Sequence, residues 1–107
     1  MFRIPYASKY SYEKAYEKTV RLTIYMNPHH HQKGISSKLY DYLEQALTDQ
    51  GIIQMLASIT ASNLASLKFH KKSNFIKNAR LEKLGFKMGE WHDEVLMRKQ
   101  INPYKNF

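Results

Sequence analysis

One stretch of the sequence, residues 22–39, most restricts what this chain can fold into. It begins as an apolar, β-branched run, breaks at Asn27-Pro28, passes Gly34 and continues as an amphipathic pattern. This order predicts a strand, a short loop and a helix. Backbone N–H groups in the first turn of a helix lack partners within the helix, and the helix dipole is positive there. Such a helix start attracts phosphate, so the stretch predicts binding of a phosphorylated cofactor.

The length and composition indicate one globular domain, which we expect to span residues 1–107. Hydrophobic residues make up 43% of the chain, as in a domain with a packed core. The chain has no cysteine, which excludes disulfides, thiolate metal sites and a cysteine nucleophile. No apolar run is long enough to cross a bilayer, and the residues after Met1 do not resemble a signal peptide. A cytoplasmic location is therefore expected.

The net charge of +8 raises the local concentration of anions, whether nucleic acids, lipid headgroups or nucleotide cofactors. Much of this charge lies between Lys68 and Arg80, where a solvated basic face explains it equally well. Tyrosines near the N-terminus could stack on bases, but the sequence has no RNA- or DNA-binding motif. A nucleic-acid partner is not expected.

Hydrophobic periodicity predicts the secondary structure. Residues 16–26 alternate as a half-buried strand, with Val20, Leu22 and Ile24 on one face. Residues 35–50 predict a helix that ends at Gly51, with an apolar face formed by Ile35, Leu39, Tyr42, Leu43, Ala46 and Leu47. The other predicted elements are strands at 2–7, 52–59, 76–86 and 94–101, a helix from Ser62 or Asn63 to about Lys72, a loop at 8–15, a turn at 87–93 and a tail at 102–107. The order β-β-α-β-α-β-β predicts an α/β fold with a mixed sheet.

Several segments carry a family resemblance: Thr23-Ile-Tyr-Met-Asn-Pro28, Lys33-Gly-Ile-Ser-Ser-Lys-Leu39, Asn63-Leu-Ala-Ser-Leu67, His70-Lys-Lys-Ser-Asn-Phe75 and Leu84-Gly-Phe-Lys-Met-Gly-Glu-Trp-His-Asp93. With them the chain resembles the GNAT superfamily of acetyl-CoA-dependent N-acetyltransferases. Within it, the chain is most similar to the phosphinothricin and methionine sulfoximine acetyltransferase group. The resemblance implies a truncated GNAT-like (acyl-CoA N-acyltransferase) mixed sheet, because Met1 aligns near the end of the third family strand. The N-terminal third of the family domain is then missing.

The resemblance also implies acetyl-CoA as the cofactor. In the family, backbone amides of the loop before the first long helix wrap the pyrophosphate, and a strand edge pairs with the pantetheine arm. The implied cofactor-binding residues here are Ile24, Tyr25, Met26, His31, Gln32, Lys33, Gly34, Ile35, Ser36 and Asn63. His31 stands where the family has Arg or Gln, and Gly34 allows a close approach of the backbone to phosphate. Asn63 also fits a helix N-cap, and Ile24 also fits an ordinary core strand.

Two positions carry the implied catalytic chemistry, Arg21 and His70. The phosphinothricin group usually has a Glu, the implied general base, where this chain has Arg21. A guanidinium cannot accept a proton at working pH, so Arg21 either binds an acidic acceptor or marks a lost activity. His70 stands where many relatives have a Tyr that protonates the leaving thiolate. Its imidazole could donate or relay that proton, or be merely structural. Trp91, His92 and Asp93 are implied to shape the acceptor pocket, although Trp91 could simply pack.

Two functional hypotheses follow from these residues. The first is an acetyl-CoA-dependent N-acetyltransferase acting on the amino group of a small amino acid or analogue. The second is a catalytically inactive truncated paralogue that binds coenzyme A or only self-associates, for example as a homodimer through an exposed sheet edge. No metal is expected, because adjacent side chains such as His29-His-His31 point in different directions and rarely chelate one ion.

Overall fold

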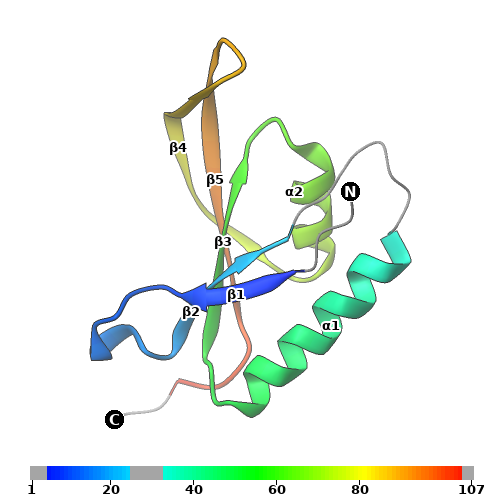
Figure 1. Cartoon of the computed structure of the whole chain (residues 1–107), viewed down its shortest axis with the longest axis vertical. Coiled ribbons are helices and arrows are strands. Elements are labelled where there is room, and N and C mark those ends of the chain that lie inside the picture. The colour runs from blue at the N-terminus through cyan, green and yellow to red at the C-terminus, as the bar shows by residue number, and fades with distance from the viewer. Residues whose placement is uncertain (1–4, 25–32, 105–107) are drawn as a thin grey trace.

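The computed structural model describes residues 5–24 and 33–104. Its elements follow one another as β1 (Tyr6–Lys9), the short 3₁₀ helix η1 (Lys14–Tyr16), β2 (Thr19–Thr23), α1 (Lys33–Asp49), β3 (Gln54–Thr60), α2 (Leu64–Lys72), β4 (Ile76–Lys87) and β5 (Glu90–Gln100) (Figure 1). The predicted α/β class and the predicted order of strands and helices are confirmed.

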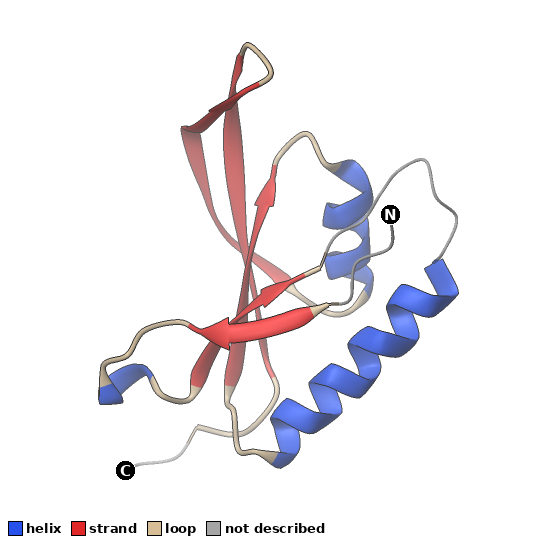
Figure 2. Cartoon of the chain, viewed as in Figure 1, coloured by secondary structure: helices blue, strands red, loops and turns tan. Residues whose placement is uncertain are grey.

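The strands form one mixed sheet in the order β1-β2-β3-β5-β4 (Figure 2). The pairs β1–β2, β3–β5 and β4–β5 are antiparallel. β2 and β3 run parallel, and α1 supplies the long crossover that a parallel pair needs. β3 therefore lies in the middle of the sheet, which explains why its sequence is nearly continuous in apolar residues.

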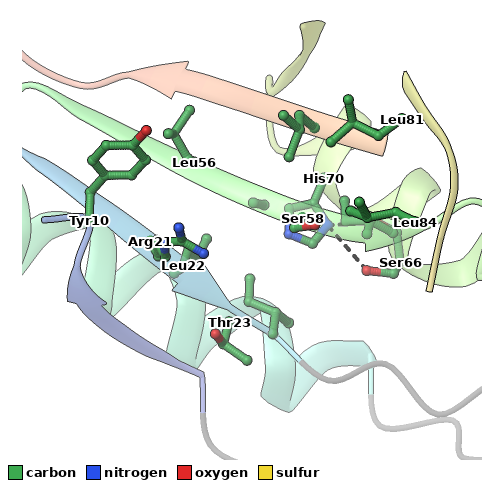
Figure 3. Close-up of a pocket in the computed structure, with 14 residues that line it drawn as sticks. Tyr10, Arg21, Leu22, Thr23, Leu56, Ser58, Ser66, His70, Leu81 and Leu84 are labelled. Carbon is green, nitrogen blue, oxygen red and sulfur yellow. Dashed lines mark hydrogen bonds between the residues drawn. The ribbon is translucent and has the colours of Figure 1, made fainter. Parts of the chain in front are cut away.

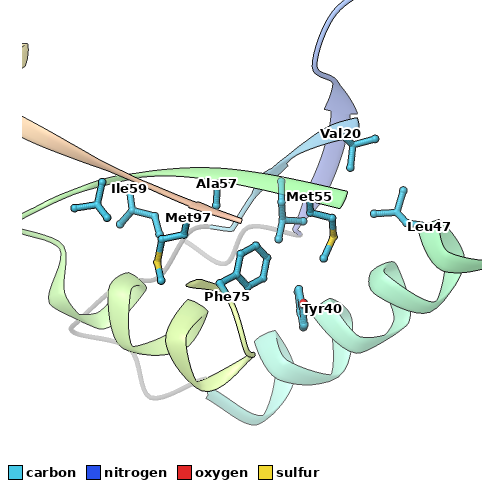
Figure 4. Packing of buried hydrophobic residues seen from close by; sticks show 10 residues of the cluster. Val20, Tyr40, Leu47, Met55, Ala57, Ile59, Phe75 and Met97 are labelled. Atoms are coloured by element: carbon cyan, nitrogen blue, oxygen red, sulfur yellow. The ribbon is translucent and has the colours of Figure 1, made fainter. Parts of the chain in front are cut away.

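The hydrophobic core lies between one face of the sheet and the two helices (Figure 4). Alternate residues of the strands point to this face, because successive side chains of a strand project to opposite sides. The strand residues of the core are Val20, Leu22, Met55, Ala57, Ile59, Val95 and Met97, and they meet Tyr40, Leu47 and Phe75. The residues between them, such as Arg21, Leu56 and Ser58, belong to the opposite face, which no described helix covers.

The prediction of a turn over residues 87–93 is wrong. β4 runs to Lys87 and β5 starts at Glu90, so Trp91 and Asp93 lie in a strand. The chain reverses at Met88 and Gly89, whose φ angles are 54° and 78°. A two-residue turn with positive φ at both positions matches the twist of its strands, so pairing continues up to the turn.

Two other local predictions differ from the structure. β1 extends to Lys9, and β2 begins only at Thr19 because Lys14–Tyr16 form η1. Tyr42 does not lie on the apolar face of α1: it is 81% exposed, whereas Tyr40 is 2% exposed. Tyr40 precedes Leu43 and Leu47 by one and two helical turns, and this spacing places it on the buried face.

Candidate functional site

The sheet separates between β2 and β3. The parallel ladder pairs Thr19–Arg21 of β2 with Gln54–Leu56 of β3. Beyond Arg21, β2 continues to Thr23, and β3 continues to Thr60 while remaining paired with β5. The facing edges of β2 and β3 beyond this point therefore present backbone N–H and C=O groups that the ladder does not use. Such an edge can hydrogen-bond an extended ligand in the manner of an added strand.

A pocket of about 440 Å³ lies at this separation (Figure 3). It reaches from the uncovered face of the sheet to α2. Its lining residues are Tyr10, Arg21, Leu22, Thr23, Ile24, Leu56, Ala57, Ser58, Ile59, Ser66, His70, Leu81, Leu84 and Leu96. Most of these side chains are apolar, with a few polar groups, which is the usual composition of a small-molecule site.

His70 is the buried titratable group of this pocket. It is 1% exposed, and its ring packs edge-on against Phe75 with 5.0 Å between ring centroids. Its Nδ1–H donates a hydrogen bond to the backbone carbonyl of Ser66, one helical turn earlier, at 2.7 Å. A carbonyl oxygen can only accept, so Nδ1 carries a proton. The neutral ring therefore has its lone pair on Nε2, which has no hydrogen-bond partner among the described residues.

The surroundings of His70 keep it neutral. Burial lowers the pKa of His70 below its ordinary value of 6.5, and the hydrogen bond to the Ser66 carbonyl opposes this shift only in part. At neutral pH the Nε2 atom is thus ready to accept a proton and cannot donate one. The predicted catalytic role of His70 stays a prediction, and a neutral ring fits the relay of a proton, in which Nε2 first takes up the proton that it later donates.

Arg21 lines the same pocket from β2 (Figure 3). Its side chain is exposed on the uncovered face, and its guanidinium carbon lies 5.4 Å from the ring centroid of Tyr10. This is within the range of a cation–π contact. Tyr10 was not among the predicted site residues, because a tyrosine in a polar segment before β2 has no local pattern that links it to Arg21.

Asn63 caps α2. Its side-chain oxygen accepts a hydrogen bond from the Ser66 amide at 3.1 Å, so the N-cap interpretation is confirmed. Asn63 does not line the pocket, and its predicted contact with a cofactor stays a prediction. The capped turn also carries Ser66, whose carbonyl orients His70.

Trp91 and Asp93 lie on the β4–β5 hairpin and outside the pocket lining. Trp91 packs on Phe86 with 5.1 Å between ring centroids. Asp93 accepts hydrogen bonds from the Lys83 amide and the Arg80 side chain, each at 2.9 Å, and these hold its pKa below the ordinary range. These contacts bridge the irregular part of β4 between Leu81 and Gly85. Contact of either residue with an acceptor stays a prediction.

The predicted phosphate site is described only in part. Helix α1 begins at Lys33, so the backbone of the Lys33, Gly34, Ile35 and Ser36 segment forms its first turn, as the sequence predicted. Tyr25, Met26, His31 and Gln32 lie outside the described residues, as do His29 and His30. Of the predicted site residues, the structure brings Arg21, Ile24 and His70 together in one pocket.

Comparison with known proteins decides the family. The acetyltransferase (GNAT) domain family matches residues 4–96. The chain belongs to this GNAT family. Among its curated relatives, this GNAT chain is 32% identical over 90 residues to a phosphinothricin N-acetyltransferase of Streptomyces viridochromogenes, covering 84% of the chain and 49% of the relative. It is 33% identical over 87 residues to the L-amino acid N-acyltransferase MnaT of Escherichia coli, covering 81% of the chain and 51% of the relative.

Solved structures agree with this assignment. The yncA protein of Salmonella typhimurium, solved with acetyl-CoA, superposes with a TM-score of 0.86 at 26% identity, over 95% of this chain and 59% of that one. A phosphinothricin acetyltransferase of Sinorhizobium meliloti in complex with acetyl-CoA gives a TM-score of 0.80 at 31% identity, over 90% of this chain and 52% of that one. The predicted family and fold are confirmed, and the GNAT chain spans about half the length of the curated relatives it matches.

Two further observations concern the described residues alone. No group of three or more His, Asp or Glu side chains gathers there in a way that could hold a metal ion. No helix within the described ranges is long and apolar enough to span a membrane.

Proposed function

We propose that this chain carries an acetyl-CoA-dependent N-acetyltransferase site that acts on the amino group of a small amino acid or analogue. The observation that carries the proposal is the buried His70, with a free Nε2, in the pocket where β2 and β3 separate. The curated relatives named above act on amino acids or phosphinothricin, and the two solved GNAT structures contain acetyl-CoA.

The residues present fit such a donor. The unpaired edges of β2 and β3 offer hydrogen-bonding backbone to an extended arm, and the first turn of α1 offers amides to phosphate. The donor, when bound, supplies an acetyl group activated as a thioester. The predicted contacts of Ile24, Gly34 and Ser36 belong to this proposal, as do those of Tyr25, Met26, His31, Gln32, Lys33, Ile35 and Asn63.

His70 would then remove a proton from the acceptor amine. An amine must be neutral to act as a nucleophile, and His70 lines the pocket with a buried Nε2 atom that has no hydrogen-bond partner among the described residues. The proton held on Nε2 can afterwards pass to the leaving sulfur, while the acylated nitrogen loses its extra proton to solvent, so that an amide and a thiol result. Arg21 cannot share this task, because a guanidinium stays protonated.

Two measurements test the proposal. Calorimetry should show saturable binding of acetyl-CoA, and thiol release should follow when amino acids are supplied. His70→Gln should lower kcat by about 100-fold or more while leaving the Kd for acetyl-CoA within about twofold. Tyr42→Phe is the control, because Tyr42 is 81% exposed on α1 and lies outside the pocket lining.

The two possible failures have different meanings. Saturable binding without thiol release from any amino acid would favour the catalytically inactive paralogue. An absence of saturable binding would overturn the proposal as a whole. The homodimer and the cytoplasmic location stay predictions.

A further inference from the structure

The lining of the pocket has an unbalanced charge. Among the 14 described residues that line it, Arg21 is the one that carries a formal charge at neutral pH, since His70 is held neutral. None of these described lining residues is an aspartate or a glutamate. The Glu94 carboxylate lies beside this lining but accepts hydrogen bonds from Ser58 and Thr60. A cation in the largely apolar lining that the structure describes favours an anionic ligand.

The guanidinium of Arg21 is available to such a ligand. Among the described residues, no carboxylate pairs with it. The guanidinium contacts the ring of Tyr10, and no described residue accepts a hydrogen bond from its N–H groups. A planar fork of donors matches the two oxygens of a carboxylate.

The register of the sheet places Arg21 at the edge of the gap. Arg21 pairs with Leu56 in the last rung of the β2–β3 ladder, so its side chain projects from the uncovered face where the strands begin to separate. His70 reaches the same pocket from α2, on the helical side of the sheet (Figure 3). A ligand lying through the gap can therefore present one end to each residue.

We infer that Arg21 binds the carboxylate of an α-amino acid acceptor whose amino group faces His70 and whose aliphatic side chain packs on the leucines of the pocket. The inference rests on the proposed function and adds the residue that selects the acceptor. The packing surface consists of Leu56, Leu81, Leu84 and Leu96. Leu81 and Leu84 are 38% and 57% exposed, so an aliphatic side chain would cover apolar surface that now faces solvent.

The test measures acceptor binding directly, so that it does not depend on turnover. The chain is labelled with ¹⁵N, saturated with coenzyme A and titrated with L-leucine or L-leucinamide while amide chemical shifts are followed. The two probes share the amine and the side chain, but the amide lacks the negative charge. We expect L-leucine to bind about 10-fold to 100-fold more tightly than L-leucinamide, the range for a charge-assisted pair of hydrogen bonds.

Variants assign this preference to one side chain. Arg21→Gln should bring the affinities for L-leucine and L-leucinamide to within about threefold of each other. Arg21→Lys should retain part of the difference, because lysine keeps the positive charge but lacks the planar pair of N–H donors. Arg98→Gln is the matched control: Arg98 pairs with Leu56 from the other side, lies outside the pocket lining and hydrogen-bonds Tyr104. It should keep the full preference for L-leucine.

The outcomes separate this inference from the proposed function. Equal affinity for the two probes in the unmodified chain would overturn the role of Arg21, and so would a preference that persists in Arg21→Gln. Failure of both probes to bind would also overturn the role of Arg21. In each of these cases, intact acetyl-CoA binding and thiol release with other amino acids or their analogues would leave the proposed function standing.

Discussion

At the scale of single residues, His70 shows how local contacts set chemistry. A helix places its side chain one turn after Ser66, and the backbone carbonyl there takes the Nδ1 proton. Phe69 and Phe75 pack against the ring and exclude water. These neighbours stabilise the neutral form, and they leave Nε2 as the reactive atom.

This environment predicts how stability depends on pH. The folded-state pKa of His70 lies below the ordinary value of 6.5, so on acidification the unfolded chain binds a proton before the folded chain does. The contribution of neutral His70 to the free energy of unfolding is therefore fully present above the folded and unfolded pKa values, and falls as the pH drops below 6.5. Urea denaturation at a series of pH values should show that the free energy of unfolding falls less steeply with decreasing pH in His70→Gln than in the unmodified chain. His92→Gln is the control. Equal slopes in all three would contradict the predicted neutrality of His70.

At the scale of elements, the start of α2 depends on one cap. Asn63→Ala removes the acceptor of the Ser66 amide and should lower the free energy of unfolding by about 0.5–2 kcal/mol, measured by urea denaturation. Asn63→Asp keeps an accepting oxygen and should retain most of the stability, but it loses the amide donor. Weaker acetyl-CoA binding in Asn63→Asp, which keeps the cap but lacks the amide donor, would support the predicted cofactor contact of Asn63. A stable Asn63→Ala chain would contradict the importance of the cap.

The β4–β5 hairpin turns through a residue that does not suit its backbone. Met88 has φ 54° and is 96% exposed, so it has a left-handed conformation without burial to offset the strain. Asn-Gly is the preferred pair for a two-residue turn with positive φ at both positions. Met88→Asn should raise the free energy of unfolding by about 0.5–1 kcal/mol, whereas Met88→Val should lower it. Thermal unfolding of the two variants checks the sign of each change.

At the scale of the whole molecule, Tyr40 joins the helical layer to the sheet. Its ring packs against Phe69 and Phe75, and its hydroxyl donates to a Glu44 carboxylate oxygen at 2.6 Å. Lys99 of β5 donates to the same hydroxyl and forms an ion pair with Glu44. Burial and the Glu44 carboxylate raise the pKa of Tyr40 above its ordinary value, so the hydroxyl stays protonated.

The two parts of Tyr40 should contribute differently to stability. Tyr40→Phe removes the hydroxyl but leaves Glu44 and Lys99 paired, and should cost about 1 kcal/mol. Tyr40→Ala also leaves a cavity and should cost about 3–5 kcal/mol. Tyr42→Ala, on the exposed side of the same helix, should change the free energy of unfolding by less than about 0.5 kcal/mol. Urea denaturation ranks the three, and a different order would contradict this account of the core.

The sequence predicted elements well where their patterns are local. Alternation identified the buried side of β2, and the pair Ser62-Asn63 identified the start of α2, because both signals lie within a few residues. Tyr42 was misplaced because an aromatic residue on the edge of an apolar face can point either way, and only packing against Phe69 and Phe75 shows that Tyr40 is the buried one. The turn at Met88 was missed because methionine does not signal positive φ.

The sequence alone determined the family, the order of elements and the candidate roles of Arg21 and His70, because these follow from short-range patterns and matched segments. Only the tertiary structure decided that Arg21, Tyr10, His70 and the leucines of β4 line one pocket. These residues come from segments far apart in the chain, and they meet through the strand order and the early separation of β2 from β3. The protonation of His70 was likewise decided by burial and by the Ser66 carbonyl, which depend on how α2 packs against the sheet.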